Sequence, residues 1–313
     1  MIQEIDIRKA FCVFCFRGDY LFPEHDLYWE RYINLLENDY HMKSEYDFFK
    51  SKLLQYYDNI EDFNNDCNKY EDILFEKYGL IIYDQVPLIR DRYLYNLYKS
   101  PLNLEEGKKY LTIDLKEAFS SLFLDSINLS KEEWVNEIAL KYNIPPLVCD
   151  SKGLRIRTSN RLRDKKNNIY QHHLRHLLYN LQQILEGSED IINLLKEKDI
   201  KPCAIVTDEL IFDITNYVNE FEPYIQEEAV INGLNVHIRL FEYKILRYKC
   251  NGYEFMHDYR VYSTGKKHFL RKNLEFIYHI IDELCADKPI TYEPIIRVGG
   301  EPIVVQNRIE VIE

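Results

Sequence analysis

The sequence predicts an α+β fold, in which an antiparallel β-sheet is backed by helices and follows a helical N-terminal region. Two short apolar runs, at residues 203–206 and 210–212, flank the acids Asp208 and Glu209. Runs of this length on either side of a turn are typical of two buried strands. Longer amphipathic patterns surround them, and residues 168–186 are one such helix.

The composition narrows the classes of function. With 313 residues, 46% of them hydrophobic, the chain has material for one large domain or two closely packed ones. Its net charge of −12 argues against a protein that coats nucleic acid by neutralising phosphates, but permits an enzyme with a local basic groove. The charged N-terminus and the lack of any apolar run near the ~20 residues of a membrane span predict a cytoplasmic protein with no membrane association.

The first predicted unit, residues 1–104, combines a hairpin with an acidic helical region. Residues 11–22 are apolar and aromatic around a Gly-Asp turn signal, which predicts the hairpin. Residues 27–78 are acidic and rich in Tyr, and their apolar residues recur at helical spacing in about three segments. Residues 80–83 are a candidate for a short strand.

The second predicted unit, residues 105–286, carries the sheet. Residues 110–113 predict a strand with Asp114 at its end, and helical spacing follows. Asp114 taken alone could equally cap that helix. Ser130 and Glu133 form a capping box, which predicts the start of the next helix.

A basic insertion, residues 150–187, lies within this second unit. Lys and Arg crowd residues 152–166, which in an acidic chain favours a functional patch over a solvated face. The helix over 168–186 follows it with a stripe of Leu, and His172 and His176 lie on its other face. The two His are spaced as a zinc pair could be, but without a Glu between them they favour a polar helix face or nucleotide contacts.

The rest of the chain alternates between helices and strands. A helix over residues 189–198 precedes the acidic hairpin, and residues 216–228 read as a further helix. Residues 234–262 are rich in strand signals, and residues 268–284 are amphipathic. Residues 287–313 form a C-terminal β segment with three apolar runs.

The two acids of the hairpin need a chemical explanation. Burying unpaired carboxylates in a strand pair is costly, and a divalent cation would remove that cost. If the strand that ends in Asp114 lay beside the hairpin, Asp114 and Asp208 would meet. Two carboxylates that bind two divalent ions are the equipment of phosphoryl or nucleotidyl transfer. A solvated turn at Asp208 and Glu209 is the alternative.

Three segments in this order resemble the palm of template-directed polymerases, and most closely that of B-family DNA polymerases. Residues 114–121 (DLKEAFSS) are similar to the family's first motif, Asp-x-x-Ser-Leu-Tyr-Pro-Ser. Residues 204–212 (AIVTDELIF) are similar to the third motif, Tyr-x-Asp-Thr-Asp-Ser followed by an apolar strand. Residues 266–269 (KKHF) are similar to the later Lys-Lys-x-Tyr element that holds the primer.

The resemblance implies a palm-like sheet and a metal-dependent nucleotidyltransferase that adds deoxynucleotides to a primer 3′ end. It implies Mg²⁺ or Mn²⁺ as cofactor, nucleoside triphosphates and a nucleic acid as substrates, and a protein partner. Asp114 and Asp208 would be the catalytic acids, and with Glu209 the metal ligands. The substrate-binding candidates are Phe119, Arg161, Arg163, Lys165, Lys166 and Arg175. The nucleic-acid-binding candidates are Lys266, Lys267 and Arg271.

Departures from the family pattern leave two alternatives open. Val206 stands in the place of the first Asp of the third motif, and Arg175 is followed four residues later by Tyr179 in place of the family's Asn. A catalytically inactive palm-fold subunit that binds nucleic acid, or a replication or defence partner, would tolerate these changes. In a reverse-transcriptase-like enzyme, Asp208 and Glu209 would stand for that family's Asp-Asp pair.

Overall fold

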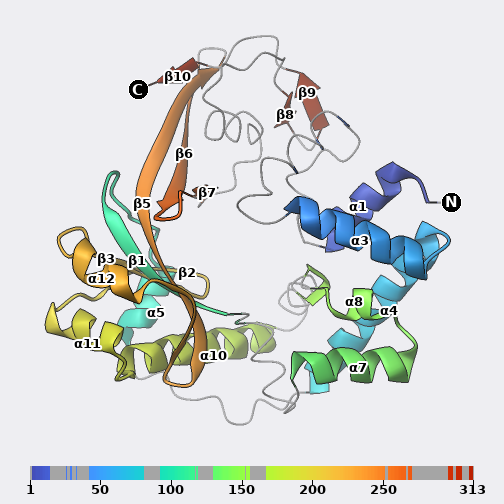
Figure 1. Cartoon of the computed structure of the whole chain (residues 1–313), viewed down its shortest axis with the longest axis horizontal. Coiled ribbons are helices and arrows are strands. Elements are labelled where there is room, and N and C mark those ends of the chain that lie inside the picture. Colours follow the sequence, from blue (N-terminus) through green and yellow to red (C-terminus); the bar gives the residue numbers. More distant parts are fainter. Residues whose placement is uncertain are drawn as a thin grey trace.

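The fold is α+β, with an eight-stranded antiparallel sheet beside a group of helices (Figure 1). The computed structural model describes residues 2–14, 26, 29, 33, 42–80, 92–116, 118, 130–151, 153–155, 167–250, 253–265, 267–269, 295–298, 301–304 and 310–312. Within those residues no helix has the length and apolar character needed to cross a bilayer.

The main sheet has the strand order β2-β3-β1-β5-β6-β7, and β4 and β10 also pair with β5. Neighbouring strands are antiparallel throughout. The strands of this sheet are β1 (Lys109–Leu115), β2 (Pro202–Val206), β3 (Glu209–Asp213), β4 (Gln226–Ile231), β5 (Leu234–Cys250), β6 (Tyr253–Tyr262), β7 (Lys267–Phe269) and β10 (Glu310–Ile312). A separate hairpin joins β8 (Ile295–Val298) to β9 (Glu301–Val304).

The connections place β1 at the centre of the sheet. Helices α10 (Asn167–Glu186) and α11 (Asp190–Glu197) lie between β1 and β2 in the chain. Helix α12 (Val218–Phe221) and the 3₁₀ turn η1 (Glu222–Tyr224) separate β3 from β4 and β5. The antiparallel pairing of β3 with β1 sets the end of β1 beside the β2–β3 turn.

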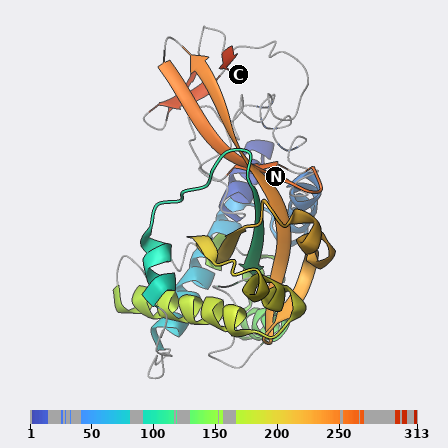
Figure 2. The ribbon, with the colours of Figure 1, turned by 90° about the vertical axis from the view of Figure 1, so that its left-hand side faces the viewer.

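Helices cover one face of the sheet. Successive residues of a strand point to opposite faces, so Leu111, Ile113 and Leu115 of β1 share one side. They lie in one buried cluster with Leu177 and Leu181 of α10, and with residues of α11 and of α5 (Arg92–Lys99). In Figure 2, α10 runs across the lower part of the strands. The opposite face carries a smaller cluster, in which Tyr110, Ile211, Phe241 and Tyr243 are buried.

The remaining helices form a second core of their own. They are α1 (Glu4–Phe14), α3 (Met42–Tyr56), α4 (Ile60–Leu80), α7 (Lys131–Tyr142) and α8 (Pro146–Cys149). Tyr70 of α4 is fully buried; its hydroxyl accepts a hydrogen bond from Trp134 Nε1 at 3.1 Å and donates one to the Cys149 carbonyl at 2.8 Å. Helices α7 and α8 thus pack with the N-terminal helices (Figure 1), although in sequence they follow β1.

Several sequence predictions are confirmed. β1, β2, β3, α10 and the pair β5–β6 lie where the patterns placed them, and strands occur in the three C-terminal apolar runs. The capping box is present, with the Ser130 hydroxyl accepting from the Glu133 N–H and the Glu133 carboxylate accepting from the Ser130 N–H.

Other predictions are wrong. The hairpin predicted from residue 11 fails, because residues 11–14 continue α1, whose buried Ile7, Ala10 and Phe11 follow a helical spacing. The helix predicted over residues 216–228 is limited to α12 and η1, and from Gln226 the chain pairs with β5 as β4. The amphipathic stretch over residues 268–284 begins in β7, and from residue 270 it lies outside the described residues. Of the strand predicted over residues 80–83, Leu80 ends α4, and residues 81–83 lie outside the described residues, so that prediction stays untested there.

Candidate active site

Strand pairing brings the predicted acids to one end of the sheet. Asp114 of β1 lies directly opposite Glu209 of β3 on one side and His237 of β5 on the other. The Leu115 N–H donates to the Asp208 carbonyl at 3.1 Å, which ties the end of β1 to the β2–β3 turn. Asp114 alternates with Ile113 and Leu115, so it lies on the face of the sheet away from α10.

The turn that carries Asp208 has an unusual backbone. Val206 pairs with Glu209, which leaves Thr207 and Asp208 as a two-residue hairpin turn. Thr207 has φ +58°, a value that tight hairpin turns need but that glycine adopts at lower cost. A β-branched residue with positive φ is a genuine outlier, and such outliers gather at functional sites.

Asp114 is held in an environment that disfavours its charge. Burial raises its pKa, and the negative charges of Asp208 and Glu209 raise it further, against the opposing effect of Arg239 and Arg260. The pKa of Asp114 is about 7. The nearest cationic group recorded for it is Arg239, whose Nη1 lies 3.8 Å from Asp114 Oδ2, beyond hydrogen-bonding distance. A metal cation at this carboxylate would therefore relieve a real electrostatic cost.

Glu209, in contrast, has a close partner. Arg260 of β6 donates from Nη1 to Glu209 Oε1 at 2.6 Å, and the side chains are 3% and 10% exposed. The Arg260 guanidinium lies over the Phe241 ring at 4.5 Å. Sequence reasoning did not find Arg260, because no motif marks it and it is 51 residues from Glu209.

Two acidic residues of β4, Glu227 and Glu228, contact side chains next to Asp114. Arg239 Nη2 lies 3.0 Å from Glu227 Oε2, and His237 Nδ1 contacts the Glu227 carbonyl oxygen. Lys116, just after β1, pairs with Glu228 at 2.5 Å. The charged groups at this edge are therefore paired with each other, Arg239 with Glu227 and Lys116 with Glu228.

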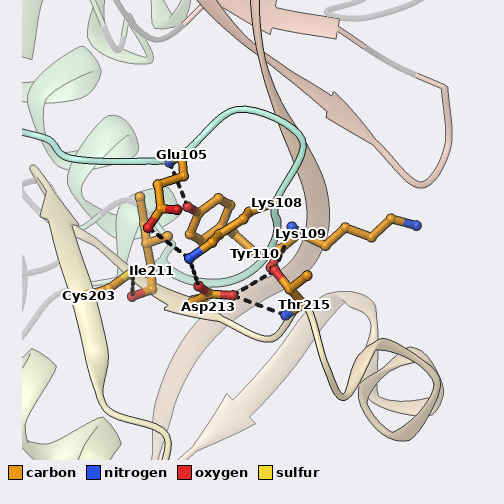
Figure 3. Close-up of polar contacts among 8 residues, drawn as sticks. All are labelled: Glu105, Lys108, Lys109, Tyr110, Cys203, Ile211, Asp213 and Thr215. Atoms are coloured by element: carbon orange, nitrogen blue, oxygen red, sulfur yellow. Dashed lines mark hydrogen bonds and ion pairs between the residues drawn. The ribbon is translucent and has the colours of Figure 1, made fainter.

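At the opposite end of the β1–β3 pair, a hydrogen-bonded network fixes the register (Figure 3). Lys108 Nζ lies 2.8 Å from Glu105 Oε1 and 3.0 Å from Asp213 Oδ2. Asp213 Oδ1 also accepts from the Thr215 hydroxyl at 2.7 Å and from the Thr215 N–H at 3.1 Å. Because a one-residue slip would move every side chain to the other face, this anchoring helps hold Asp114 opposite Glu209.

The structure does not bring the other predicted residues to the acids. Arg175 is exposed on α10, which covers the opposite face of the sheet. The backbone of Lys267 lies in β7, opposite Val261. The other candidates lie outside the described residues: Phe119, Arg161, Arg163, Lys165, Lys166, Lys266 and Arg271.

The donors present fit a hard divalent cation. Mg²⁺ is usually bound through one or two carboxylates, with water and substrate phosphates completing its coordination. Asp114 and Asp208 supply two such carboxylates, and burial with like-charge repulsion disfavours ionised Asp114 when no cation is bound. In the described part of the chain, no group of three or more His, Cys, Asp and Glu side chains is arranged to hold a metal.

Comparisons with protein-family models, with curated proteins and with solved structures find no match to this chain.

Proposed function

We propose that the chain is a metal-dependent nucleotidyltransferase with a palm-like sheet, in which Asp114 and Asp208 bind the divalent cations. The observation that carries this proposal is the pairing of β1 with β3, which joins the two acidic motifs at one end of the sheet. In the resemblance to B-family polymerases, these motifs are a strand that ends in an acid and a strand–turn–strand with an acid at the turn.

The proposed reaction is the attack of a primer 3′-hydroxyl oxygen on the α-phosphorus of a deoxynucleoside triphosphate. A new O–P bond forms, the bond to the bridging oxygen breaks, the hydroxyl proton passes to solvent, and pyrophosphate leaves. Bound Mg²⁺ or Mn²⁺ supplies the charge that activates the hydroxyl and neutralises the leaving group. Asp114, with its pKa about 7, gives up its proton readily when a cation binds at neutral pH.

Substrate contacts are also part of the proposal. Phe119 and the basic residues of the 150–187 segment would contact the incoming triphosphate, and the Lys266–Lys267 pair with Arg271 would contact the primer. Arg175 is left out of this set, because α10 carries it on the side of the sheet away from Asp114. A protein partner would complete the nucleic-acid site.

Primer extension and untemplated nucleotide addition with Mg²⁺ or Mn²⁺ test the proposal. Asp114→Asn and Asp208→Asn are each expected to lower incorporation by about 10³-fold, since each removes a metal ligand. Asp213→Asn is the matched control, because Asp213 lies in the same strand pair at the far end. The proposed enzymatic activity is wrong if wild-type protein incorporates no nucleotide on any template and its melting temperature does not rise with either metal.

A catalytically inactive palm-fold subunit is the second candidate. The observation that favours it is Val206, which stands beside the turn where the polymerase motif has an acid. Such a subunit would bind nucleic acid with unchanged affinity in Asp114→Asn and Asp208→Asn and in the absence of divalent ions. Electrophoretic mobility shifts of a labelled primer with EDTA or Mg²⁺ separate the two candidates.

A further inference from the structure

The buried ion pair between Arg260 and Glu209 distinguishes Glu209 from the other two acids. Its 2.6 Å separation is that of a charge-assisted hydrogen bond, whereas Asp114 lies 3.8 Å from Arg239. Arg239 is also more exposed and shares its charge with Glu227. Glu209 is thus the acid with a close, buried counter-ion recorded in the structure.

The guanidinium of Arg260 is fixed from several sides. β6 pairs with β5 so that Arg260 lies opposite Tyr243, and the guanidinium packs over the Phe241 ring at 4.5 Å. Its Nη1 also lies 3.4 Å from the Tyr262 hydroxyl. These contacts oppose a movement of Arg260 that would follow Glu209 toward another ligand.

Arg260 in turn needs Glu209 as the counter-ion of its buried positive charge. In the described part of the chain, its Nε and Nη2 are buried and have no hydrogen-bond partner. If Glu209 left, the guanidinium would keep a buried positive charge without a close counter-ion, which is strongly unfavourable. Coordination of a metal by Glu209 would therefore cost the energy of this pair.

We infer that Arg260 holds Glu209 out of the metal-binding set, so that Asp114 and Asp208 alone bind the cation. This inference rests on the proposed function and corrects the expectation that Glu209 is a ligand. Glu209 and Arg260 are positioning residues: they fix the first residue of β3, and with it the turn that presents Asp208.

Mn²⁺ binding, measured by isothermal titration calorimetry without nucleotide, tests the inference. The decisive variant is Glu209→Gln combined with Arg260→Met, which removes both charges together and so leaves no unpaired buried ion. We expect its Mn²⁺ dissociation constant to stay within about threefold of wild type, since the net charge is unchanged. Asp208→Asn is the ligand control and is expected to weaken binding by at least about tenfold.

Arg260→Met alone supplies a second readout. It frees the Glu209 carboxylate and removes a nearby positive charge, so Mn²⁺ should bind about tenfold more tightly. Adding Glu209→Gln should cancel that gain. Arg260→Lys, which keeps the charge, should keep the wild-type affinity.

Two different results would overturn two different claims. If the double variant binds Mn²⁺ as weakly as Asp208→Asn, Glu209 is a ligand and the inference is wrong while the metal site stands. If wild-type protein binds no Mn²⁺, the proposed function itself is wrong, and the role of Arg260 falls with it.

Discussion

Asp114 and Asp213 lie on the same face of the same strand pair, yet their surroundings are opposite. At Asp213, burial would raise the pKa, but hydrogen bonds from Thr215 and Lys108 outweigh it and leave the pKa below its usual range. At Asp114, burial and the neighbouring acids raise the pKa to about 7, because the positive charges of Arg239, at 3.8 Å, and of Arg260 only partly offset them. The ionised carboxylate of Asp213 therefore stabilises the fold, whereas that of Asp114 destabilises it unless a bound cation neutralises the charge.

The comparison also shows how a sheet can carry both kinds of site. The end with Lys108, Asp213 and Thr215 is closed by contacts within the chain (Figure 3). The end with Asp114 and Asp208 gathers negative charge that the chain only partly neutralises. Four substitutions test this contrast, from the largest expected effect to the smallest.

The largest effect on stability is expected from Arg260→Met alone. It leaves the Glu209 carboxylate buried without its cation, which should lower the free energy of unfolding by about 3–5 kcal/mol. Urea denaturation measures the loss. The control is the double variant with Glu209→Gln, which should recover most of the lost stability. If the double variant is as unstable as the single one, the Arg260–Glu209 ion pair does not account for the loss.

Asp114→Asn should make the protein more stable at alkaline pH. The folded-state pKa of Asp114 is raised to about 7, so the folded state holds a proton that the unfolded state has lost, and stability falls as pH rises from about 4 to 7. Removing the charge should raise the free energy of unfolding by on the order of 2–4 kcal/mol at pH 8 and change it little near pH 4. Thermal melts across this range measure the gain, and an equal gain at both pH values contradicts the prediction.

Asp213→Asn should act in the opposite direction and more weakly. The folded-state pKa of Asp213 is lowered, so its contribution is present above the unfolded-state pKa and is lost as pH falls through the folded-state value. Losing its ion pair with Lys108 should lower the free energy of unfolding at pH 7 by less than the change at Asp114, because water screens this partly exposed pair. Melts of this variant beside Asp114→Asn should therefore shift to opposite sides of wild type.

Thr207→Gly is expected to have the smallest effect. Glycine adopts the φ of +58° without the steric cost that Thr bears, so the free energy of unfolding should rise by about 1 kcal/mol. The control is Thr207→Ala, which keeps a Cβ and should gain less. If Thr207 only completes a turn, nucleotide incorporation should stay unchanged, whereas a fall would show that the strained turn positions Asp208.

The sequence predicted the acidic strands well for local reasons. Short apolar runs with acids at their ends mark β1, β2 and β3 without any knowledge of distant contacts. Distant contacts decide the rest. Arg260 reaches Glu209 only through the pairing of β6 with β5, and residues 226–231 form a strand because β5 offers a partner, which overrides their helical pattern.

The N-terminal hairpin failed for a related reason. Residues 11–14 are apolar enough for a strand, but Phe11 is fully buried among the rings of Trp29, Tyr46 and Phe49, and only a helix presents it there together with Ile7. These partners come from segments whose arrangement the local pattern does not encode. For the site, the pattern supplied the acids, and the fold supplied the arginines that decide what each acid does.

The helical core built from segments on both sides of β1 has a consequence for synthesis on the ribosome. The hydrogen-bond partners of Tyr70 are Trp134 and Cys149, so the N-terminal helices cannot complete their core until residues well beyond β1 have emerged. β1 in turn has no partner until β3 appears about a hundred residues later in the chain. The nascent chain must therefore keep its central strand without this partner for about a third of its synthesis, and the apolar residues of that strand need protection from aggregation during that time.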